Sequence, residues 1–516
     1  MDDQRKEAMT EILRSTAARV AQAAPQGWRR GRVHAYRGPS HSGHRGTGYE
    51  MPDGTIGGMR VGFHGLGKLY QLSGAAPEEL TIELAVEPSG RFEAVTSRAI
   101  TQDRYRHGWF LYILRPDTLP REPGADQAPP ADPTPAGDPR EAVRLFREYM
   151  MKRAGILGEK EPLPDPLDPA ERAALLDAFP GDLPSDLAAL YGEADGDDIG
   201  LFHGHQWLSL KSTTTHIHHR PERTWTYAPW TTGDVEPPGV IRRQLSSPAW
   251  IPFATSTGGD YLAVDMDPGP AGRPGQVIRV GVNYDGAPAY VADSVTTMLR
   301  GLVQTLDRGD YEEDDGYLDV DAGLPSYLDE SLTLWHGEAP IPKDVGMLRC
   351  LVVDKVRELD LEPMRGAPHL HEVVLFGEGP ADMRALRDVP LEALRLELDA
   401  ADLRLLTGHP TLREVTLRTR EPVDLGVLRT LPRLEGLELA EAAGQDLTVI
   451  GELDGLLSLT LSPEQWRRLG KLPPLAAAGL SGDPTPGQLN EWAARFGPGE
   501  EADGCEYFTG RFDGST

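Results

Sequence analysis

Cysteines and long apolar runs are scarce in this chain, which has two cysteines among 516 residues. A membrane-spanning helix needs about 20 consecutive apolar residues, so the sequence argues against a protein anchored by such helices. Cys350 and Cys505 lie far apart, which favours a reducing compartment over a disulfide scaffold. The N-terminal segment lacks the basic start and the apolar core of a secretory signal. We therefore expect a cytoplasmic protein.

Motifs of nucleotide and nucleophile chemistry are also missing. The sequence has no phosphate-binding P-loop, no dinucleotide-binding glycine fingerprint and no serine elbow. The acidic run at residues 195–198 lacks the remaining ligands of a calcium loop. We predict a protein without catalytic residues, cofactor or metal.

A histidine cluster leaves one alternative open. Its members lie close together in the sequence: His203, His205, His216, His218 and His219. Alternate residues of a strand share a face, so a metal site is conceivable, and a metal-dependent enzyme stays an alternative. However, no cysteine is near and the spacing fits no standard zinc pattern. We expect a pH-sensitive surface or interface patch instead.

Basic residues are outnumbered, with 52 against 80 acids and a net charge of −28. Such a field repels nucleic acid and anionic membranes, and it speeds the encounter with a basic partner. Two interpretations stay open: the charge serves solubility in an acidic proteome, or the surface must meet a basic protein. The length exceeds what one hydrophobic core supports and indicates about three domains.

Two segments divide the chain. Residues 116–139 are rich in proline, alanine and glycine without periodicity, which predicts an extended linker. Residues 310–323 begin with a run that has seven acids and no base up to Asp321, which predicts a solvated acidic linker. The resulting plan is an N-terminal domain at 1–115, a middle domain at 140–309, a repeat at 324–500 and a tail at 501–516.

The N-terminal domain is predicted to be a helix followed by strands. Apolar residues recur at helical spacing in 3–23, and Leu80, Ile82, Leu84 and Val86 alternate with smaller or polar residues. This order predicts a small α+β domain. Together with "APQGWRR" and "ELAVEPSGRFEAV", it resembles the YezG-like immunity family. That resemblance implies an N-terminal helix packed on an antiparallel sheet.

The middle domain carries several motifs in a fixed order: "LPSDLAALYGEADG", "GLFHGHQWLSL", "WIPFATSTGGDYLAVDMDPGPAGRPGQVI" and "VADSVTTML". Over roughly residues 165–310 this order is similar to the SUKH superfamily (Smi/Knr-type domain). The resemblance implies an α+β fold with a central antiparallel sheet and a protein-binding role without catalysis. Many bacterial members are immunity proteins that neutralise toxins of polymorphic toxin systems, and the yeast members are scaffolding regulators.

Two carboxylates within this signature could suggest chemistry. Asp265 and Asp267 share one strand face, a geometry that can serve acid–base work or metal binding. No histidine or nucleophile lies nearby in the sequence, and Asp267 begins an Asp-Pro-Gly turn. We therefore interpret the stretch as a structural signature, while a site stays the alternative.

The C-terminal part is periodic. Segments of the form L-x-x-L-x-L start at residues 348, 370, 391, 412, 434, 456 and 475. This period lies near the roughly 20 to 29 residues of leucine-rich repeats. Each repeat is expected to add one parallel strand and one helix-like return to a curved solenoid.

The predicted fold class is multidomain α+β: an N-terminal α+β domain, a SUKH-like α+β domain with a central antiparallel sheet, and an α/β leucine-rich-repeat solenoid. The leading functional hypothesis is an immunity protein that binds a basic toxin domain, and the alternative is a regulatory scaffold. The candidate contact residues are Asp195, Asp197, Asp198, Trp207, Trp225, Tyr227 and Trp230 on a face expected to be exposed, and Glu372, Arg395, Arg413, Glu414 and Glu438 on the strand face of the repeat.

Overall fold

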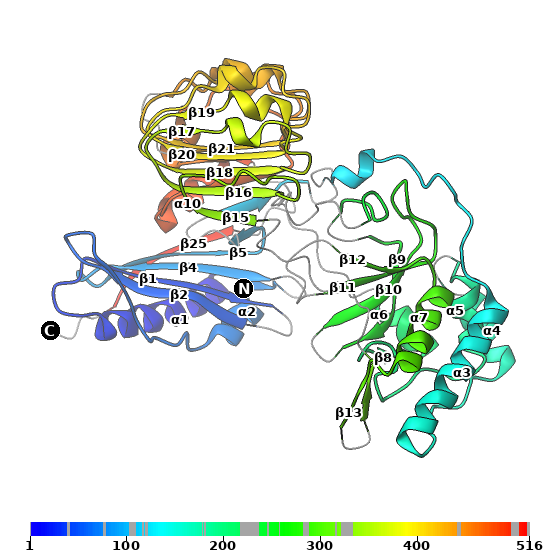
Figure 1. Cartoon of the computed structure of the whole chain (residues 1–516). Coiled ribbons are helices and arrows are strands. Elements are labelled where there is room, and N and C mark those ends of the chain that lie inside the picture. Colours follow the sequence, from blue (N-terminus) through cyan, green and yellow to red (C-terminus); the bar gives the residue numbers. More distant parts are fainter. Residues whose placement is uncertain are drawn as a thin grey trace. The chain divides into compact units, whose positions relative to one another are not determined.

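A computed structural model gives the architecture of the chain (Figure 1). It describes residues 2–38, 42–75, 79–102, 110–115, 118, 122–177, 179, 182–216, 237–244, 247–256, 259–281, 288–314, 317–320, 334–440, 445–496 and 505–512. The chain divides into two compact units, residues 1–119, 377–380 and 395–516 in the first, and 120–376 and 381–394 in the second. A mixed α+β fold with several sheets is confirmed.

In the first unit, helix α1 (Asp2–Ala23) packs on a six-stranded antiparallel sheet with the order β25-β5-β4-β1-β2-β3. The strands are β1 (Arg30–Arg37), β2 (Ser42–Glu50), β3 (Ile56–Gly58), β4 (Leu80–Val86), β5 (Arg91–Ser97) and β25 (Cys505–Arg511), and helix α2 (Leu66–Ser73) follows β3. The apolar stripe of α1 includes Met9, Leu13 and Val20, which are buried against Ile82 and Leu84 of the sheet. The predicted amphipathic helix is confirmed over this stripe.

The C-terminal strand is part of this N-terminal sheet. Residues 505–511 were expected in a tail, but they form β25, which pairs antiparallel with β5 from Cys505 opposite Ser97 to Arg511 opposite Arg91. Phe508 is buried in the same core as Met9. The two ends of the chain therefore build one sheet.

The first unit also holds most of the repeat. Strands β21 (Glu414–Thr419), β22 (Gly436–Ala440), β23 (Ser458–Leu461) and β24 (Ala477–Leu480) pair in parallel. Strand β24 then pairs antiparallel with β7 (Phe110–Ile113), and β7 with β6 (Ile100–Gln102). Strands β6 and β7, which the sequence placed in the N-terminal domain, thus terminate the repeat sheet.

The returns between these strands are short. They are the 3-10 helices η5 (Leu403–Leu406), η6 (Leu425–Thr430) and η7 (Thr448–Glu452), followed by α9 (Pro463–Arg468), α10 (Pro486–Ala493) and η8 (Ala494–Phe496). Leucines of each repeat, such as Leu417, Leu439 and Leu461, point inward and are buried. The predicted strand and helix-like return per repeat is confirmed in this part.

The second unit contains the middle domain, whose antiparallel sheet has the order β12-β11-β10-β9-β8. Its strands are β8 (Gln206–Trp207), β9 (Trp250–Thr255), β10 (Asp260–Asp265), β11 (Gln276–Gly281) and β12 (Ala289–Ala292), and its helices are α3 (Pro139–Leu157), α4 (Pro169–Asp177), α5 (Ser185–Leu190), α6 (Leu210–His216) and α7 (Val295–Arg308). Two helix starts are capped by side chains: the Asp168 carboxylate accepts a hydrogen bond from Ala170 N at 2.8 Å, and Ser294 accepts one from Thr297 N.

Both predicted linkers are ordered where the structure describes them. Residues 123–126 form the 3-10 helix η1 (Pro123–Asp126). In the acidic segment, β13 (Glu312–Asp314) and β14 (Tyr317–Asp319) form an antiparallel hairpin that extends from the middle domain (Figure 1). Leu318 and Val320 belong to the domain's hydrophobic core. Neither segment is the free connector that its composition predicted, because a few side chains anchor it.

The second unit also begins the repeat. Strand β15 (Leu334–Glu338) pairs in parallel with β16 (Cys350–Val356), and β18 (Glu372–Gly377) lies next to β16, whereas β20 (Ala393–Leu398) crosses the unit boundary. The returns carry β17 (Leu359–Asp360) paired in parallel with β19 (Ala381–Asp382), and the 3-10 helices η3 (Glu362–Met364) and η4 (Arg384–Asp388). Among the described residues, no helix has the length and hydrophobicity needed to cross a bilayer.

Candidate functional site

Two of the predicted contact residues are structural. Trp207 is 1% exposed and packs against Phe146, Tyr191 and Phe202, so the expectation of an exposed tryptophan is wrong. The Asp197 carboxylate is buried and accepts backbone N–H groups of Ile199, Gly200 and Trp207 at 2.7–2.8 Å. The carboxylate therefore holds this loop together and is not exposed for contact with a partner.

The neighbouring acids differ from Asp197. Asp195 is half-buried and accepts the backbone N–H of Leu210 at 2.8 Å, next to the start of α6. Asp198 is exposed, and its backbone carbonyl accepts a hydrogen bond from Gln206. The remaining aromatic candidates, Trp225, Tyr227 and Trp230, lie outside the described residues. Asp198 is thus the one acid of this run that is exposed to a partner.

The described histidines of the cluster are buried. Burial lowers the pKa of His203 to about 4, so this side chain is neutral at physiological pH. His205 is also buried, which contradicts a pH-sensitive surface patch at these two residues. His218 and His219 lie outside the described residues, as does the side chain of His216. Within the described part of the chain, no group of histidine, cysteine and acidic residues is arranged to hold a metal ion.

The acidic hairpin is pinned to the middle domain by a buried arginine. Arg153 of α3 is 1% exposed and forms two contacts with the Glu161 carboxylate, one of them at 2.6 Å. Its Nη1 also donates to the Tyr149 hydroxyl at 3.1 Å and to the Leu318 carbonyl at 3.2 Å. Because Leu318 belongs to β14, the arginine ties the hairpin to the core. The hairpin is therefore attached to the domain by this hydrogen bond and by the buried Leu318 side chain.

This hairpin is acidic and carries an exposed aromatic ring. Glu312 and Glu313 are exposed, and Tyr317 is 43% exposed. Glu312 lies directly opposite Asp319 across the strand pair. Like charges in directly opposite positions destabilise a hairpin. From the sequence this segment is predicted only as a linker, although its seven acids without a base already distinguish it from its surroundings.

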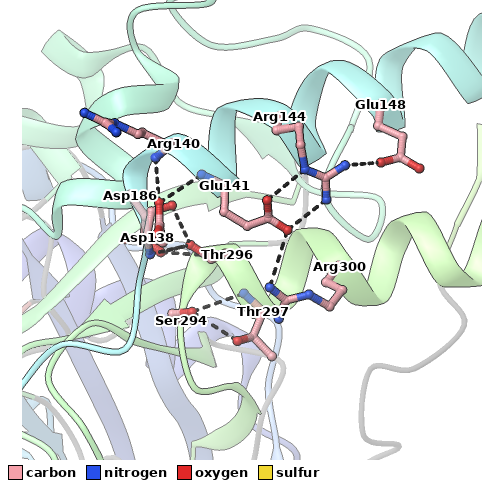
Figure 2. Close-up of polar contacts among 10 residues, drawn as sticks. All are labelled: Asp138, Arg140, Glu141, Arg144, Glu148, Asp186, Ser294, Thr296, Thr297 and Arg300. Atoms are coloured by element: carbon pink, nitrogen blue, oxygen red, sulfur yellow. Dashed lines mark hydrogen bonds and ion pairs between the residues drawn. The ribbon is translucent and has the colours of Figure 1, made fainter.

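Unlike the acidic hairpin, the surface formed by helices α3 and α7 carries acids that are paired with neighbouring arginines (Figure 2). The Arg144 guanidinium contacts Glu141 and Glu148 at 2.7 Å each. Arg300 of α7 lies 3.7 Å from the same Glu141. Such exposed pairs add little stability, but they leave little net charge on this face.

Polar side chains fix the helix starts next to this face. The buried Asp186 carboxylate accepts Thr296 N at 2.9 Å and the Thr296 hydroxyl at 3.0 Å (Figure 2). The Asp138 N–H donates to the same hydroxyl oxygen at 3.0 Å. The starts of α3, α5 and α7 therefore meet at Asp186, which is a structural use of a buried acid.

On the repeat, the predicted stripe is a ladder of paired charges. Arg395 Nε donates to Glu397 at 2.8 Å, and Arg418 lies 3.6 Å from Glu397 and 3.5 Å from Glu438. Glu397 and Arg418 were not among the predicted contact residues, although they continue the same strand face two residues beyond Arg395 and Thr416. Arg413 is buried, 3.7 Å from Glu435, and Glu372 and Glu414 are half-buried. Glu438 is buried as well, so of the five predicted contact residues only Glu372, Arg395 and Glu414 are partly exposed.

The signature carboxylate Asp265 supports a turn. It is fully buried, and its oxygens accept Asp267 N at 3.1 Å and Gln276 Nε2 at 3.0 Å. Gln276 Nε2 also donates to the Val240 carbonyl at 2.8 Å. Within the described residues this acid faces a glutamine and backbone groups, which fits a structural role.

Burial raises the pKa of Asp265 to about 7, from an ordinary value of 3.8. A group whose pKa is raised on folding adds stability at low pH that is lost as the pH rises through about 7. From pH 5 to pH 8 the loss amounts to about 2 to 3 kcal/mol. Asp265→Asn should remove this component, so urea unfolding of the variant should depend less on pH than that of the wild type. Asp165→Asn, at an exposed acid, is the control, and parallel profiles of all three proteins would contradict the assignment.

Comparison with known proteins places the middle domain. A model of the SMI1 / KNR4 family (SUKH-1) matches residues 166–301. These residues form a SMI1/KNR4 domain. The fold that the resemblance implied, a central antiparallel sheet with flanking helices, is the one described above, and the SMI1/KNR4 domain includes the loop held by Asp197 as well as the turn held by Asp265.

Curated relatives share this domain with the chain. A glucan synthesis regulatory protein of Neurospora crassa is 41% identical over 76 residues, which cover 15% of this chain and 14% of the relative. The cell wall biosynthesis/cell cycle regulator smi1 of Schizosaccharomyces pombe is 37% identical over 99 residues, 18% and 19% of the two chains. The cell wall assembly regulator SMI1 of Saccharomyces cerevisiae is 30% identical over 91 residues, 17% and 18%. The chain therefore spans less than a fifth of each of these relatives.

Solved structures similar to the chain include two internalins of Listeria monocytogenes. Internalin C2 matches with a TM-score of 0.20 at 20% identity and covers 23% of this chain and 54% of its own. Internalin F matches with a TM-score of 0.22 at 21% identity and covers 25% and 41%.

Proposed function

We propose that the chain is a protein-binding protein without catalytic activity and that its acidic hairpin contacts a basic protein partner. The observation that carries the proposal is the hairpin β13–β14, which exposes Glu312, Glu313 and Tyr317 to solvent and is hydrogen-bonded to the buried Arg153. Placing Glu312 opposite Asp319 costs stability unless a cation compensates. A basic partner would supply that cation, and Tyr317 would supply aromatic contact area.

The finer form of the proposal is an immunity role. A net charge of −28 attracts a basic protein over long range and raises the association rate. The hairpin would then contact the basic active-site rim of a toxin such as a nuclease and block its access to substrate. The resemblance of residues 1–115 to the YezG-like family stays a prediction that agrees with this role. A cytoplasmic location is part of the proposal, in keeping with two cysteines that are not paired with each other.

Reversing the hairpin charge should weaken binding. The variant Glu312→Lys/Glu313→Lys is expected to bind the partner at least about tenfold more weakly, mostly through a slower and less salt-dependent association. Glu159→Lys/Asp165→Lys alters two exposed acids that directly precede the SMI1/KNR4 domain and has the same net charge, so it is the matched control. The full-length wild type and both variants serve as baits in a lysate of the source cells, and captured proteins are quantified by mass spectrometry. Equal capture by both variants would contradict a contact at the hairpin.

The immunity role has its own test. The captured basic protein is expressed alone and together with the chain in a heterologous bacterium, and growth is recorded. Arrest by the partner alone, relieved by the wild-type chain and not by the hairpin variant, is the expected result. Absence of arrest would contradict the antidote role while leaving the binding proposal in place.

A second candidate function is a regulatory scaffold. The names of the relatives that share the SMI1/KNR4 domain, which include regulators of cell wall assembly and glucan synthesis, favour it. In that case the wild-type bait would capture several unrelated housekeeping proteins, and the hairpin variant would lose only some of them.

A further inference from the structure

Residues 122–138, called here the strap, precede the SMI1/KNR4 domain in the sequence and make contacts with it within the second unit. At one end, the Gly124 N–H donates to the Arg243 carbonyl at 2.8 Å. Arg242 Nη1 donates to the Gln127 carbonyl at 2.9 Å, and the Arg243 N–H donates to Gln127 Oε1 at 2.9 Å. Two consecutive arginines of the domain therefore hold the start of the strap through both backbone and side chain.

The rest of the strap is anchored at three further points. Ala131 N donates to the Pro270 carbonyl at 3.0 Å, and Asp132 forms an ion pair with Arg273. At the far end, a Cβ atom on Gly137 would stand 2.3 Å from the Asp186 carboxylate, so glycine is needed for this approach. The composition of the strap predicted an extended linker. In the structure the strap contacts the domain along its whole length.

The Arg243 side chain points from this arrangement to the repeat. Its Nη1 and Nη2 lie 2.8 and 2.9 Å from the two carboxylate oxygens of Glu392, in a bidentate pair. The two side chains are 10% and 6% exposed. Glu392 directly precedes β20, and its own N–H donates to the His371 carbonyl of the preceding repeat at 2.8 Å. The carboxylate is therefore fixed by the repeat backbone.

We propose that Arg242 and Arg243 form a clasp that locks the strap, the SMI1/KNR4 domain and the first repeats into one body. Bidentate arginine–carboxylate pairs are directional, and removing one partner of a buried pair leaves the other charge uncompensated. Arg242 connects the strap to the SMI1/KNR4 domain, because its Nη1 donates to Gln127 of the strap and its Nη2 lies 3.0 Å from Asp267 of the domain. A partner that binds the SMI1/KNR4 domain then meets the first repeats at a fixed distance and orientation. The inference is independent of the identity of the partner.

A charge-swap experiment tests the clasp. Spin labels are attached at Glu171→Cys in the domain and Glu358→Cys in the repeat, both exposed positions, in the full-length chain with Cys505→Ser. The distance distribution is measured by pulsed electron resonance for the wild-type pair, Arg243→Glu, Glu392→Arg and the double swap. The matched control is Arg147→Glu, which breaks a bidentate arginine–glutamate pair of similar length on the exposed surface between α3 and Glu193 of the domain.

The expected result is a narrow distribution in the wild type and in Arg147→Glu, a distribution at least twice as wide in either clasp variant, and recovery in the double swap. A broad wild-type distribution would show that the clasp does not form in solution. A narrow distribution in Arg243→Glu would show that other contacts hold the body together. Failure of the double swap to recover the narrow distribution would overturn the assignment to this pair. Circular dichroism of each variant shows whether it is folded.

Discussion

Replacing Asp197 with alanine is expected to lower the free energy of unfolding of the SMI1/KNR4 domain by about 3 kcal/mol, because it removes the acceptor of three backbone N–H groups, of which those of Gly200 and Trp207 are buried. The carboxylate accepts Ile199 N and Gly200 N on one oxygen and Trp207 N on the other. These bonds close the loop that leads into β8, whose Trp207 fills the core. The loss of one acid should therefore loosen both the loop and the core.

The measurement is hydrogen exchange of the full-length chain, followed in peptides that cover residues 195–210, together with the urea midpoint of the domain. Asp198→Ala is the matched control, because this neighbour is exposed and substitutions at exposed sites usually change stability by less than about 0.5 kcal/mol. The expected result is fast exchange in Asp197→Ala and wild-type exchange in Asp198→Ala. Equal behaviour of the two variants would mean that the acidic run serves only as surface charge.

These two acids also show the reach of sequence reasoning. A run of acids at residues 195–198 indicated surface charge, and nothing in its composition distinguished the buried carboxylate from the exposed one. The distinction arises from backbone N–H groups that come together only after the chain has turned back from Trp207. Trp207 was misplaced for the same reason, since a tryptophan between polar residues is compatible with core or surface until its neighbours in space are known.

Periodic features were predictable, since their signal is local. The repeat strands β21 and β22 each begin two residues after the start of their L-x-x-L-x-L segments at 412 and 434. The acidic hairpin and the strap were predicted as linkers, because composition alone cannot show that Arg153 or Arg243 will anchor them. Their long-range contacts leave no periodic trace in the sequence.

The C-terminal strand β25 is another segment whose long-range contacts the sequence did not reveal. Substitutions in this strand are expected to destabilise the N-terminal sheet. Phe508 is buried between α1 and the sheet, and Arg5 of α1 forms an ion pair with Glu506 at 2.8 Å. Phe508→Ala should therefore cost about 3 to 5 kcal/mol, whereas Thr509→Ala, at an exposed neighbour, should cost less than about 0.5 kcal/mol. Thermal unfolding of the full-length variants measures both. Similar midpoints would contradict the burial of this strand in solution.

Truncation after residue 504 should have a stronger effect than either substitution. It removes Phe508 from the core and also exposes the β5 edge, whose unpaired backbone groups favour aggregation. A chain that ends at Phe512 is the control and should behave as the wild type.

A peptide can test the same strand. Because the lost strand pairs with β5 along seven residues, a peptide of residues 505–512 should bind the truncated chain by strand addition and raise its melting temperature. The same peptide with Phe508→Ala should not. Rescue by the first peptide alone would show that the N-terminal sheet accepts a strand chosen by its buried aromatic residue, whereas rescue by both or by neither would exclude that explanation.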